Sequence, residues 1–405
     1  MKVTTLFIGN ELLIGQTVNS NLTLIGQKLL AAGYRLLRSE TIPDGHESIK
    51  LAVKKALLDS DVVITVGGLG PTSDDITRKA VASACDTTVY TSDAIIDHLK
   101  ERLKGRATQP SKDYLDRQSE SILNAEVHFN ETGYAPILEL DHNEKKVFLL
   151  PGPPREFGPA VDNTILPYLK KSSPAELISE LLLLYGAKES DVEKRSLPLL
   201  EKYPDMEIAY CANLGRVAVR LSFPQAKKAI LEEAVADAKK IYAEEVITAD
   251  SIAEEVLNLC RSKSYNLATT ESCTGGLIGG DITAVPGSSD TFVGSVNVYS
   301  NEWKQKMLGI SADTLEQHGA VSAECAEEMV RGLANKYLVD CAIAVTGVAG
   351  PGGGTVEKPV GLVYISVLVA NKCLVYKHVF RGDREDVRKQ TVLYSLNYLR
   401  KALIK

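Results

Sequence analysis

Hydrophobic and polar positions in the first 170 residues follow a repeating order of strand and helix. Apolar runs at Val3–Ile8, Tyr34–Leu37 and Val62–Val66 predict buried strands, and a helix is expected from about Ser73. Two earlier helices are marked by apolar positions at helical spacing: Leu22, Ile25, Leu29 and Leu30, then Ile49, Val53, Ala56 and Leu57. Because parallel strands need crossover connections, this order predicts a doubly wound, mostly parallel sheet covered by helices.

The rest of the chain divides into two further patterns. The less regular residues 171–247 predict a small α+β domain, with strands at about 177–185, 206–210 and 216–222 and helices at about 189–197 and 227–244. The last region predicts a second α/β unit, with helices at about 251–263, 275–283, 300–308, 322–336 and 384–403 and strands at about 266–270, 292–299, 341–346, 360–369 and 373–380. We therefore predict an α/β protein with domains at residues 1–170, 171–247 and 248–405.

The composition is that of an ordinary globular protein and narrows the classes of function. Of 405 residues 44% are apolar and 24% are charged, and the net charge of −6 argues against a general nucleic-acid binder. No apolar stretch approaches the ~20 residues that span a bilayer, and the N-terminal strand lacks the features of a signal peptide. The seven cysteines form no Cys-x-x-Cys pair, so we predict neither disulfides nor a zinc site. We expect a cytoplasmic protein with small-molecule partners, without membrane or nucleic-acid partners.

A serine at a strand-to-helix turn offers nucleophilic chemistry without a histidine. Ser272 follows a predicted strand and precedes Gly275 and Gly276, and Tyr299 and Lys304 follow about thirty residues later. A serine hydroxyl needs a base, and a helix that begins after Ser300 puts Lys304 near the positive end of the helix dipole. There its pKa is expected to fall. Tyr299 is expected to relay the proton or to donate to the oxyanion, and unsatisfied N–H groups around Thr274–Gly276 to hold that oxyanion.

Other interpretations of these residues stay open. Ser272 and Thr274 are also common helix-capping residues, and Lys304 is compatible with a solvated helix face. Cys273 is a rival nucleophile, although a cysteine in this position is more often a small buried hydrophobe. Arginines near Gly382 could hold a phosphate, with Arg384 and Arg388 on one helix face beside Arg381. Their alternative is a solvated helix with Glu385 and Asp386.

A glycine-rich turn in the N-terminal region suggests a phosphate site. Gly67, Gly68 and Gly70 follow a buried strand and lead to Thr72, Asp74 and Asp75. Asp75 with Asp74 could hold a divalent cation, and Asp44 follows the preceding strand at the same carboxyl edge of the sheet. The alternative is local, because Thr72-x-x-Asp75 is also a capping box.

The C-terminal motifs resemble the nicotinamide-mononucleotide amidohydrolase domain in order and spacing across residues 250–405. The matching segments are Glu271–Gly276, Tyr299–Glu302 with Lys304, His318–Ser322, Thr346–Pro351, Lys358–Gly361 and Gly382–Arg384. The resemblance implies Ser272 as nucleophile with Tyr299 and Lys304 as activators, and places Thr346, Gly347 and Arg384 in the substrate pocket. It implies release of ammonia from nicotinamide mononucleotide without a cofactor.

The N-terminal motifs resemble the molybdopterin-binding-like domain of the competence/damage-inducible protein A (CinA) family. The matching segments are Gly9–Gln16, which holds Glu11, then Asn19–Asn21, Gly67–Thr72 with Asp74 and Asp75, and Leu150–Pro154 with Glu156. The middle segment Gly186–Ser190 resembles the linking domain of that family. The resemblance implies a homodimer and a metal-dependent ADP-ribose pyrophosphatase that uses magnesium, manganese or cobalt, with Asp44 and Asp75 at acidic positions.

One departure from the family pattern falls in the N-terminal region. Where the family has Gly-Thr-Ala-Pro-Gly, this chain has Tyr134 and Ile137 in Gly133–Ile137. These changes alter an expected pocket wall. An alternative hypothesis therefore makes the N-terminal half a non-catalytic nucleotide-binding or sensor module.

Overall fold

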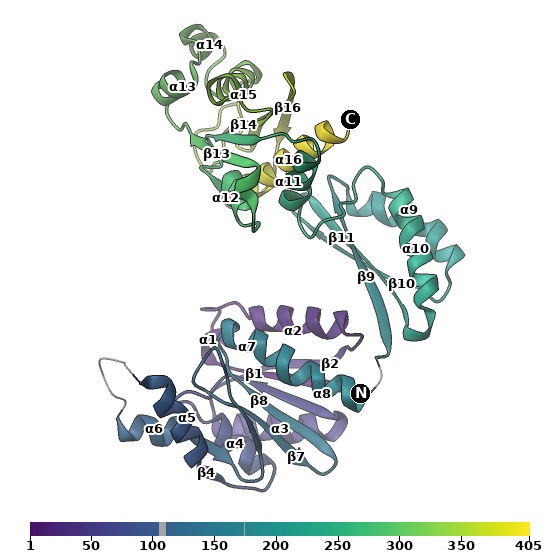
Figure 1. Ribbon diagram of the computed structural model, residues 1–405, viewed down its shortest axis with the longest axis vertical. Coiled ribbons are helices and arrows are strands. Elements are labelled where there is room, and N and C mark those ends of the chain that lie inside the picture. Colours follow the sequence, from purple (N-terminus) through teal and green to yellow (C-terminus); the bar gives the residue numbers. More distant parts are fainter. Residues whose placement is uncertain (105–110, 174) are drawn as a thin grey trace. The chain divides into compact units, whose positions relative to one another are not determined.

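The computed structural model describes residues 1–104, 111–173 and 175–405 (Figure 1). The chain forms two compact units, one of residues 1–179 with 223–228 and one of residues 180–222 with 229–405. None of the helices in these described ranges is long and apolar enough to cross a bilayer. The predicted α/β class is confirmed in both units, whereas the division into three domains stays a prediction.

The first unit is built on a mixed sheet whose strands lie in the order β2-β1-β3-β8-β7-β6. Their bounds are β1 Val3–Ile8, β2 Leu36–Ile42, β3 Val62–Val66, β8 Lys145–Leu150, β7 Ile137–His142 and β6 Glu126–His128. The first four are parallel neighbours, and β7 and β6 continue the sheet antiparallel. The sheet is therefore mostly parallel, as predicted. The carboxyl ends of its parallel strands meet at one edge, where open α/β sheets bind ligands.

Helices cover both faces of this sheet (Figure 1). One face packs Ile25 and Phe157 from α2 (Ser20–Ala31), α7 (Pro154–Ala160) and α8 (Leu166–Ser172), and the other packs Val53 and Val81 from α3 (His46–Asp59) and α4 (Thr77–Ala84). The remaining elements of this region are α1 Asn10–Leu13, β4 Val89–Thr91, α5 Asp93–Leu103, α6 Lys112–Gln118, β5 Glu120–Ile122 and the π-helical η1 Val161–Ile165. The prediction of a helix from Ser73 was wrong, because α4 begins at Thr77.

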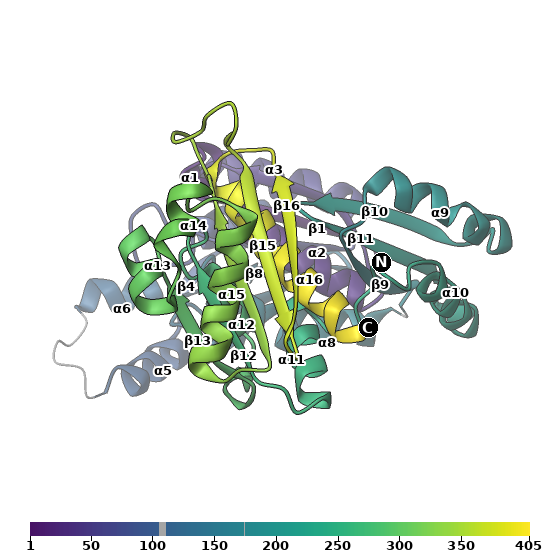
Figure 2. The ribbon, with the colours of Figure 1, turned by 90° about the horizontal axis from the view of Figure 1, so that it is seen from above.

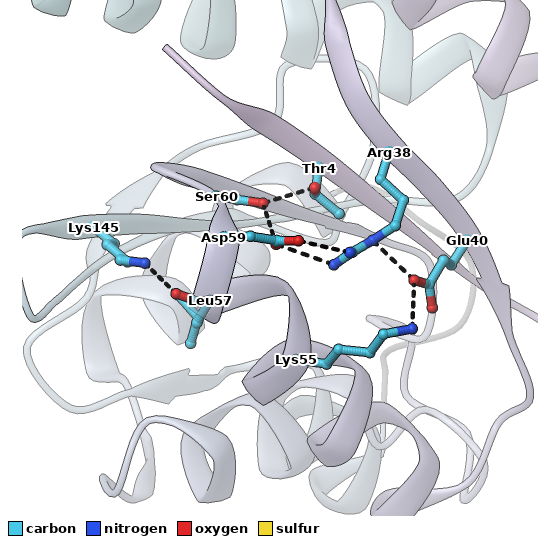
Figure 3. Close-up of polar contacts among 8 residues, drawn as sticks. All are labelled: Thr4, Arg38, Glu40, Lys55, Leu57, Asp59, Ser60 and Lys145. Carbon is cyan, nitrogen blue, oxygen red and sulfur yellow. Dashed lines mark hydrogen bonds and ion pairs between the residues drawn. The ribbon is translucent and has the colours of Figure 1, made fainter.

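Polar contacts fix the end of α3 against three strands (Figure 3). Ser60, which ends the helix, shares a buried 2.7 Å hydrogen bond with Thr4 of β1. Arg38 of β2 donates to Asp59 at 2.9 Å, and Lys145 of β8 donates to the carbonyl of Leu57. The exposed ion pairs contribute little individually, since such pairs are worth about 0–1 kcal/mol. The buried Thr4–Ser60 contact joins two hydroxyls, and Ser60 also donates to Asp59 at 3.4 Å.

A small sheet with the strand order β10-β11-β9 follows. Its elements are β9 Leu177–Tyr185, α9 Glu189–Lys202, β10 Glu207–Asn213, β11 Arg216–Pro224, η2 Gln225–Lys227 and α10 Lys228–Ile241. Strands β10 and β11 form an antiparallel hairpin in which Asn213 pairs with Arg216. The paired strands predicted here are confirmed.

The C-terminal sheet has the strand order β13-β12-β14-β15-β16. Its strands are β12 Leu267–Glu271, β13 Phe292–Asn297, β14 Cys341–Gly347, β15 Leu362–Val369 and β16 Lys372–Val379. Strands β13, β12 and β14 are parallel, and β15 and β16 are antiparallel. The carboxyl ends of β12 and β14 therefore bring Ser272 and Thr346 to one edge.

Two layers of helices enclose the C-terminal sheet, with α15 in front and α16 behind in Figure 2. The core behind the sheet joins α11, α12 and α16, and the core in front joins α13 and α15. The helices are α11 Ile252–Ser262, α12 Leu277–Thr283, α13 Asn301–Leu308, α14 Ala312–Gln317, α15 Ala323–Tyr337 and α16 Arg384–Ile404, with a short η3 at Ser288–Asp290. The six-residue α14 was not predicted.

Within the second unit, helix α16 also contacts the segment before α11 and the tip of the β10–β11 hairpin. Arg400, which is 2% exposed, donates to the carbonyls of Glu244 at 3.0 Å and Val246 at 2.6 Å. At the tip of the β10–β11 hairpin, Gly215 has a φ of +73° and leaves a would-be Cβ only 3.1 Å from the Tyr394 ring. A side chain at residue 215 would be strained by the backbone and crowded by this ring. The hairpin tip thus lies beside the middle of α16.

Candidate active site

The structure brings Ser272 and Lys304 together at the carboxyl edge of the C-terminal sheet. Ser272 directly follows β12, and its Oγ lies 3.1 Å from Nζ of Lys304. Both side chains are buried, with 8% and 1% of their surface exposed. Helix α13 begins after Ser300, whose side chain accepts a hydrogen bond from the N–H of Trp303. The predicted N-cap is therefore confirmed, and Lys304 occupies the fourth helical position.

Lys304 lies among neutral groups. Its Nζ is 3.0 Å from the carbonyl oxygen of Val298 and 3.2 Å from that of Tyr299. It makes no ion pair with a carboxylate in the described part of the chain, and burial lowers the pKa of Lys304 below its ordinary value. A neutral amine has two N–H donors and one lone pair. The two carbonyls can accept both donors, which leaves the lone pair for the Ser272 hydroxyl.

Glu271 was missed by the sequence reasoning and corrects one expectation. Its fully buried carboxylate accepts hydrogen bonds from the N–H groups of Gly276 at 2.9 Å, Ile278 at 3.1 Å and Gly279 at 2.9 Å. The prediction that Gly276 offers a free N–H to an oxyanion was therefore wrong, because a carboxylate already occupies it. The N–H groups of Thr274 and Gly275 make no hydrogen bond within the described residues.

The interpretations of Ser272, Thr274 and Lys304 as surface or capping residues are also wrong. Helix α12 begins after Gly276, without a side-chain cap, so neither Ser272 nor Thr274 caps it. Lys304 is buried and not solvated. Cys273 is buried as expected, and burial raises the pKa of its thiol to about 12. A thiol that stays protonated is a poor nucleophile, which favours Ser272 over Cys273.

A cavity of about 210 Å³ surrounds the reactive pair. Its lining includes Ser272, Tyr299, Lys304, Thr346, Gly347 and Arg384. Thr346 is buried and donates to the carbonyl of Ala320 at 2.6 Å, so its hydroxyl shapes the wall. The Tyr299 side chain is 70% exposed, and within the described residues its hydroxyl makes no hydrogen bond. Its part in proton transfer stays a prediction.

Another predicted substrate residue, Arg388, lines a second, larger cavity of about 1140 Å³, whereas Thr274, Gly275 and Gly276 are on the lining of neither cavity. The larger cavity shares Ala349 and Arg384 with the one around Ser272. Arg384 donates to the carbonyl of Gly350 at 2.8 Å, and Arg388 donates to that of Thr274 at 2.7 Å. Both guanidinium groups keep further N–H donors. Thr274 itself is fully buried, and its carbonyl oxygen is the acceptor that holds Arg388.

In the first unit, most of the predicted nucleotide residues line one cavity of about 590 Å³: Glu11, Asp44, Gly67, Gly68, Gly70, Asp74 and Asp75. Thr72 is not on that lining in the described structure; it donates to Oδ2 of Asp75 through its N–H at 2.9 Å. The capping-box alternative is wrong, because α4 begins after Ile76. Gly67, at a φ of +103°, is also needed locally, since a Cβ there would lie 2.5 Å from the Ile8 carbonyl oxygen.

The acidic groups of this cavity suit a hard divalent cation. Asp44 accepts the N–H of Asn10 at 2.8 Å through Oδ2, and Asp75 also uses Oδ2, so each keeps a second oxygen without a protein partner in the described residues. Magnesium and manganese prefer such oxygen ligands. A separate cluster of Glu126, His128 and Glu139 was not predicted. Lys146 already lies 2.6 Å from Glu139 there and offsets its charge.

Comparisons with known proteins identify the family. The description "CinA C-terminal domain" matches residues 249–403, and "Probable molybdopterin binding domain" matches residues 4–171. The CinA-like protein of Thermotoga maritima is 36% identical over 405 residues, which cover 99% of this chain and 98% of that protein. The chain belongs to the CinA family. A second CinA-like protein, from Kosmotoga olearia, is 35% identical and covers 100% of this chain and 99% of its own length.

A solved structure is similar to part of this CinA family member. The competence/damage inducible protein CihA from Agrobacterium tumefaciens is 37% identical over 38% of this chain and 94% of its own, with a TM-score of 0.37. These names refer to competence and damage and name no reaction. The chemistry of this CinA family member therefore has to be argued from its own sites.

Proposed function

We propose that the C-terminal domain hydrolyses the carboxamide of nicotinamide mononucleotide to nicotinate mononucleotide and ammonia. The observation that carries the proposal is the 3.1 Å contact between Ser272 Oγ and Lys304 Nζ, both buried and without a carboxylate to hold the charge on the amine. A lysine with a lowered pKa can act as a general base near neutral pH. The resemblance of the surrounding motifs to amidohydrolases of this substrate supports the choice of amide.

In this mechanism Lys304 takes the hydroxyl proton of Ser272 as Oγ attacks the carboxamide carbon. The tetrahedral intermediate then collapses, the C–N bond breaks, and Lys304 returns the proton to the departing nitrogen, which leaves as ammonia. Water next attacks the acyl-enzyme and gives a proton to Lys304. The ester bond then breaks, and Lys304 returns that proton to Oγ of Ser272, which releases nicotinate mononucleotide and restores the enzyme. The N–H groups of Thr274 and Gly275 are the donors left for the oxyanion, and Tyr299 assists from the cavity wall.

Production of ammonia and nicotinate mononucleotide can be compared in the parent protein and Lys304→Met. We expect loss of turnover by about 10²–10⁴-fold or more, the usual worth of a general base. Lys306→Met, which removes an exposed lysine from the same helix, is the matched control and should keep activity. Full activity in Lys304→Met would contradict the proposed base.

A second proposed function belongs to the N-terminal cavity. The joint lining by the glycine loop, Asp44 and Asp75 supports metal-dependent cleavage of the pyrophosphate in ADP-ribose. Asp44 and Asp75 would hold the divalent cation, which supplies charge neutralisation for the phosphates. The loop glycines would bring backbone N–H groups close to the phosphates.

The hydrolysis of ADP-ribose with added magnesium, manganese or cobalt tests this second function. Asp75→Asn should abolish turnover, while Asp97→Asn, an exposed aspartate on α5, should not change it. Binding of ADP-ribose without turnover by the parent protein would instead support the alternative of a non-catalytic sensor module.

A further inference from the structure

The larger cavity beside Ser272 has a wall that lies outside the C-terminal family domain. Asn213, Leu214 and Arg216 of the β10–β11 hairpin line it together with Arg384 and Arg388 of α16. The family model of the C-terminal domain covers residues 249–403. Arg216 lies before this range, on β11 of the small sheet. The hairpin tip lies against α16, where a Cβ on Gly215 would come within 3.1 Å of the Tyr394 ring.

We infer that this cavity binds the phosphate of the mononucleotide, and that Arg216 is one of its ligands with Arg384 and Arg388. The inference rests on the proposed deamidation and adds a specificity-determining residue to it. The shared residues Ala349 and Arg384 connect the two cavities. When the carboxamide lies in the small cavity, the rest of the mononucleotide can therefore extend into the large one.

The unused donors of the three arginines support an anionic ligand. The Arg216 side chain makes no hydrogen bond or ion pair within the described residues, and Nε of Arg388 is buried without a partner. Arg384 uses Nη1 for the Gly350 carbonyl and keeps its other donors. Guanidinium groups match phosphate oxygens in geometry and charge, so this set suits a phosphate better than a neutral group.

The lining of this cavity holds one more cationic side chain than acidic ones: Arg216, Arg384, Arg388 and Lys389 against Asp281, Asp383 and Glu385. The Asp383 carboxylate accepts the N–H groups of Glu385 and Asp386, at 2.8 and 2.9 Å. Glu385 is paired with Lys389 at 2.5 Å. Asp281 is the acid of this lining without a partner in the described chain, and its oxygens suit the hydroxyl groups of a ribose. A sugar phosphate thus fits both kinds of group.

The experiment measures ammonia release from nicotinamide mononucleotide and from the nucleoside that lacks the phosphate. Arg216→Ala should raise KM for the mononucleotide by about tenfold or more, the usual worth of a hydrogen bond to a charged group, and change kcat little. For the nucleoside, parent and variant should behave alike. Arg220→Ala, which removes the same charge from the same strand outside the cavity lining, is the matched control.

Three outcomes would overturn the inference: an unchanged KM for the mononucleotide, an equal rise for the nucleoside, or the same effect in Arg220→Ala. Calorimetric titration of inorganic phosphate into the resting full-length protein gives a second readout without turnover. Arg216→Ala should weaken phosphate binding and Arg220→Ala should not. If the parent protein releases no ammonia, the proposed deamidation fails, and this titration alone decides whether the cavity is a phosphate site.

Discussion

Lys304 is a buried amine whose polar neighbours are a hydroxyl and two carbonyls, with no negative charge among them. Adding a proton would place an unpaired cation in the protein interior, which is costly. In the protonated form Nζ donates to all three oxygens, whereas in the neutral form the two carbonyls accept its N–H groups and the lone pair is open to the serine hydroxyl. Burial makes the protonated lysine unfavourable, and for the same reason it favours the neutral amine that can act as a base.

The first prediction concerns pH. Because burial lowers the pKa of Lys304 from 10.5, the neutral base forms at lower pH than in a free lysine, and kcat/KM should rise with pH through this lowered value. Lys304→Arg should lose this ascending limb together with activity, because arginine stays protonated. A rising limb of unchanged position and height in Lys304→Arg would assign the titration to another group.

Glu271 allows a second prediction at the residue scale. In Glu271→Gln the side-chain amide keeps the shape but offers one oxygen, so at least one buried N–H among Gly276, Ile278 and Gly279 loses its acceptor. We expect a loss of about 1–3 kcal/mol in the free energy of unfolding of the C-terminal domain, measured by urea denaturation, with a lower kcat. The exposed Glu302→Gln should show neither effect. Unchanged stability and kcat in Glu271→Gln would show that the site does not depend on the hydrogen bonds from Glu271 to the start of α12.

At the element scale, helix boundaries depended on side-chain contacts that a periodic pattern does not contain. Strands β1 and β3 were predicted with their observed bounds, because each is a fully buried apolar run. The start of α4 was placed four residues early. Thr72 donates through both its N–H and its hydroxyl to Asp75, and such local side-chain bonds hold a turn in competition with a helix.

Arg400 gives a third prediction, for the contact between α16 and the segment before α11. Arg400→Met removes donors from the buried carbonyls of Glu244 and Val246, so this segment should detach more readily. Limited proteolysis should show faster cleavage near these residues. Lys401→Met, the neighbouring position on the same helix, should leave the cleavage rate at the parent value. Equal protection in Arg400→Met and the parent would show that the apolar core alone fixes the segment.

At the scale of the whole molecule, the sequence predicted which edges of the two sheets bring the candidate site residues together, because turns after buried strands hold the polar and glycine residues. It did not predict Glu271 as the acceptor at α12, since a single acid at a strand end gives no periodic signal. It also did not predict that Arg216 lines the cavity beside Ser272. That position depends on how a hairpin packs on α16, which only the three-dimensional structure contains.

A fourth prediction follows from the placement of the two sites in separate units. A chelator, or Asp75→Asn, should leave ammonia release unchanged and stop the cleavage of ADP-ribose. Ser272→Ala should have the opposite effect. The two reactions can be assayed in the same preparation. Loss of both activities in either variant would mean that the sites do not work independently.

The most direct test of the central claim is ammonia release from nicotinamide mononucleotide in excess chelator, by the parent protein and by Ser272→Ala. The exposed Ser289→Ala serves as control, and circular dichroism checks the fold. We predict release by the parent and by Ser289→Ala, and none above background by Ser272→Ala. Release by folded Ser272→Ala at the parent rate, or no release by the parent, would contradict a serine–lysine amidase at this site.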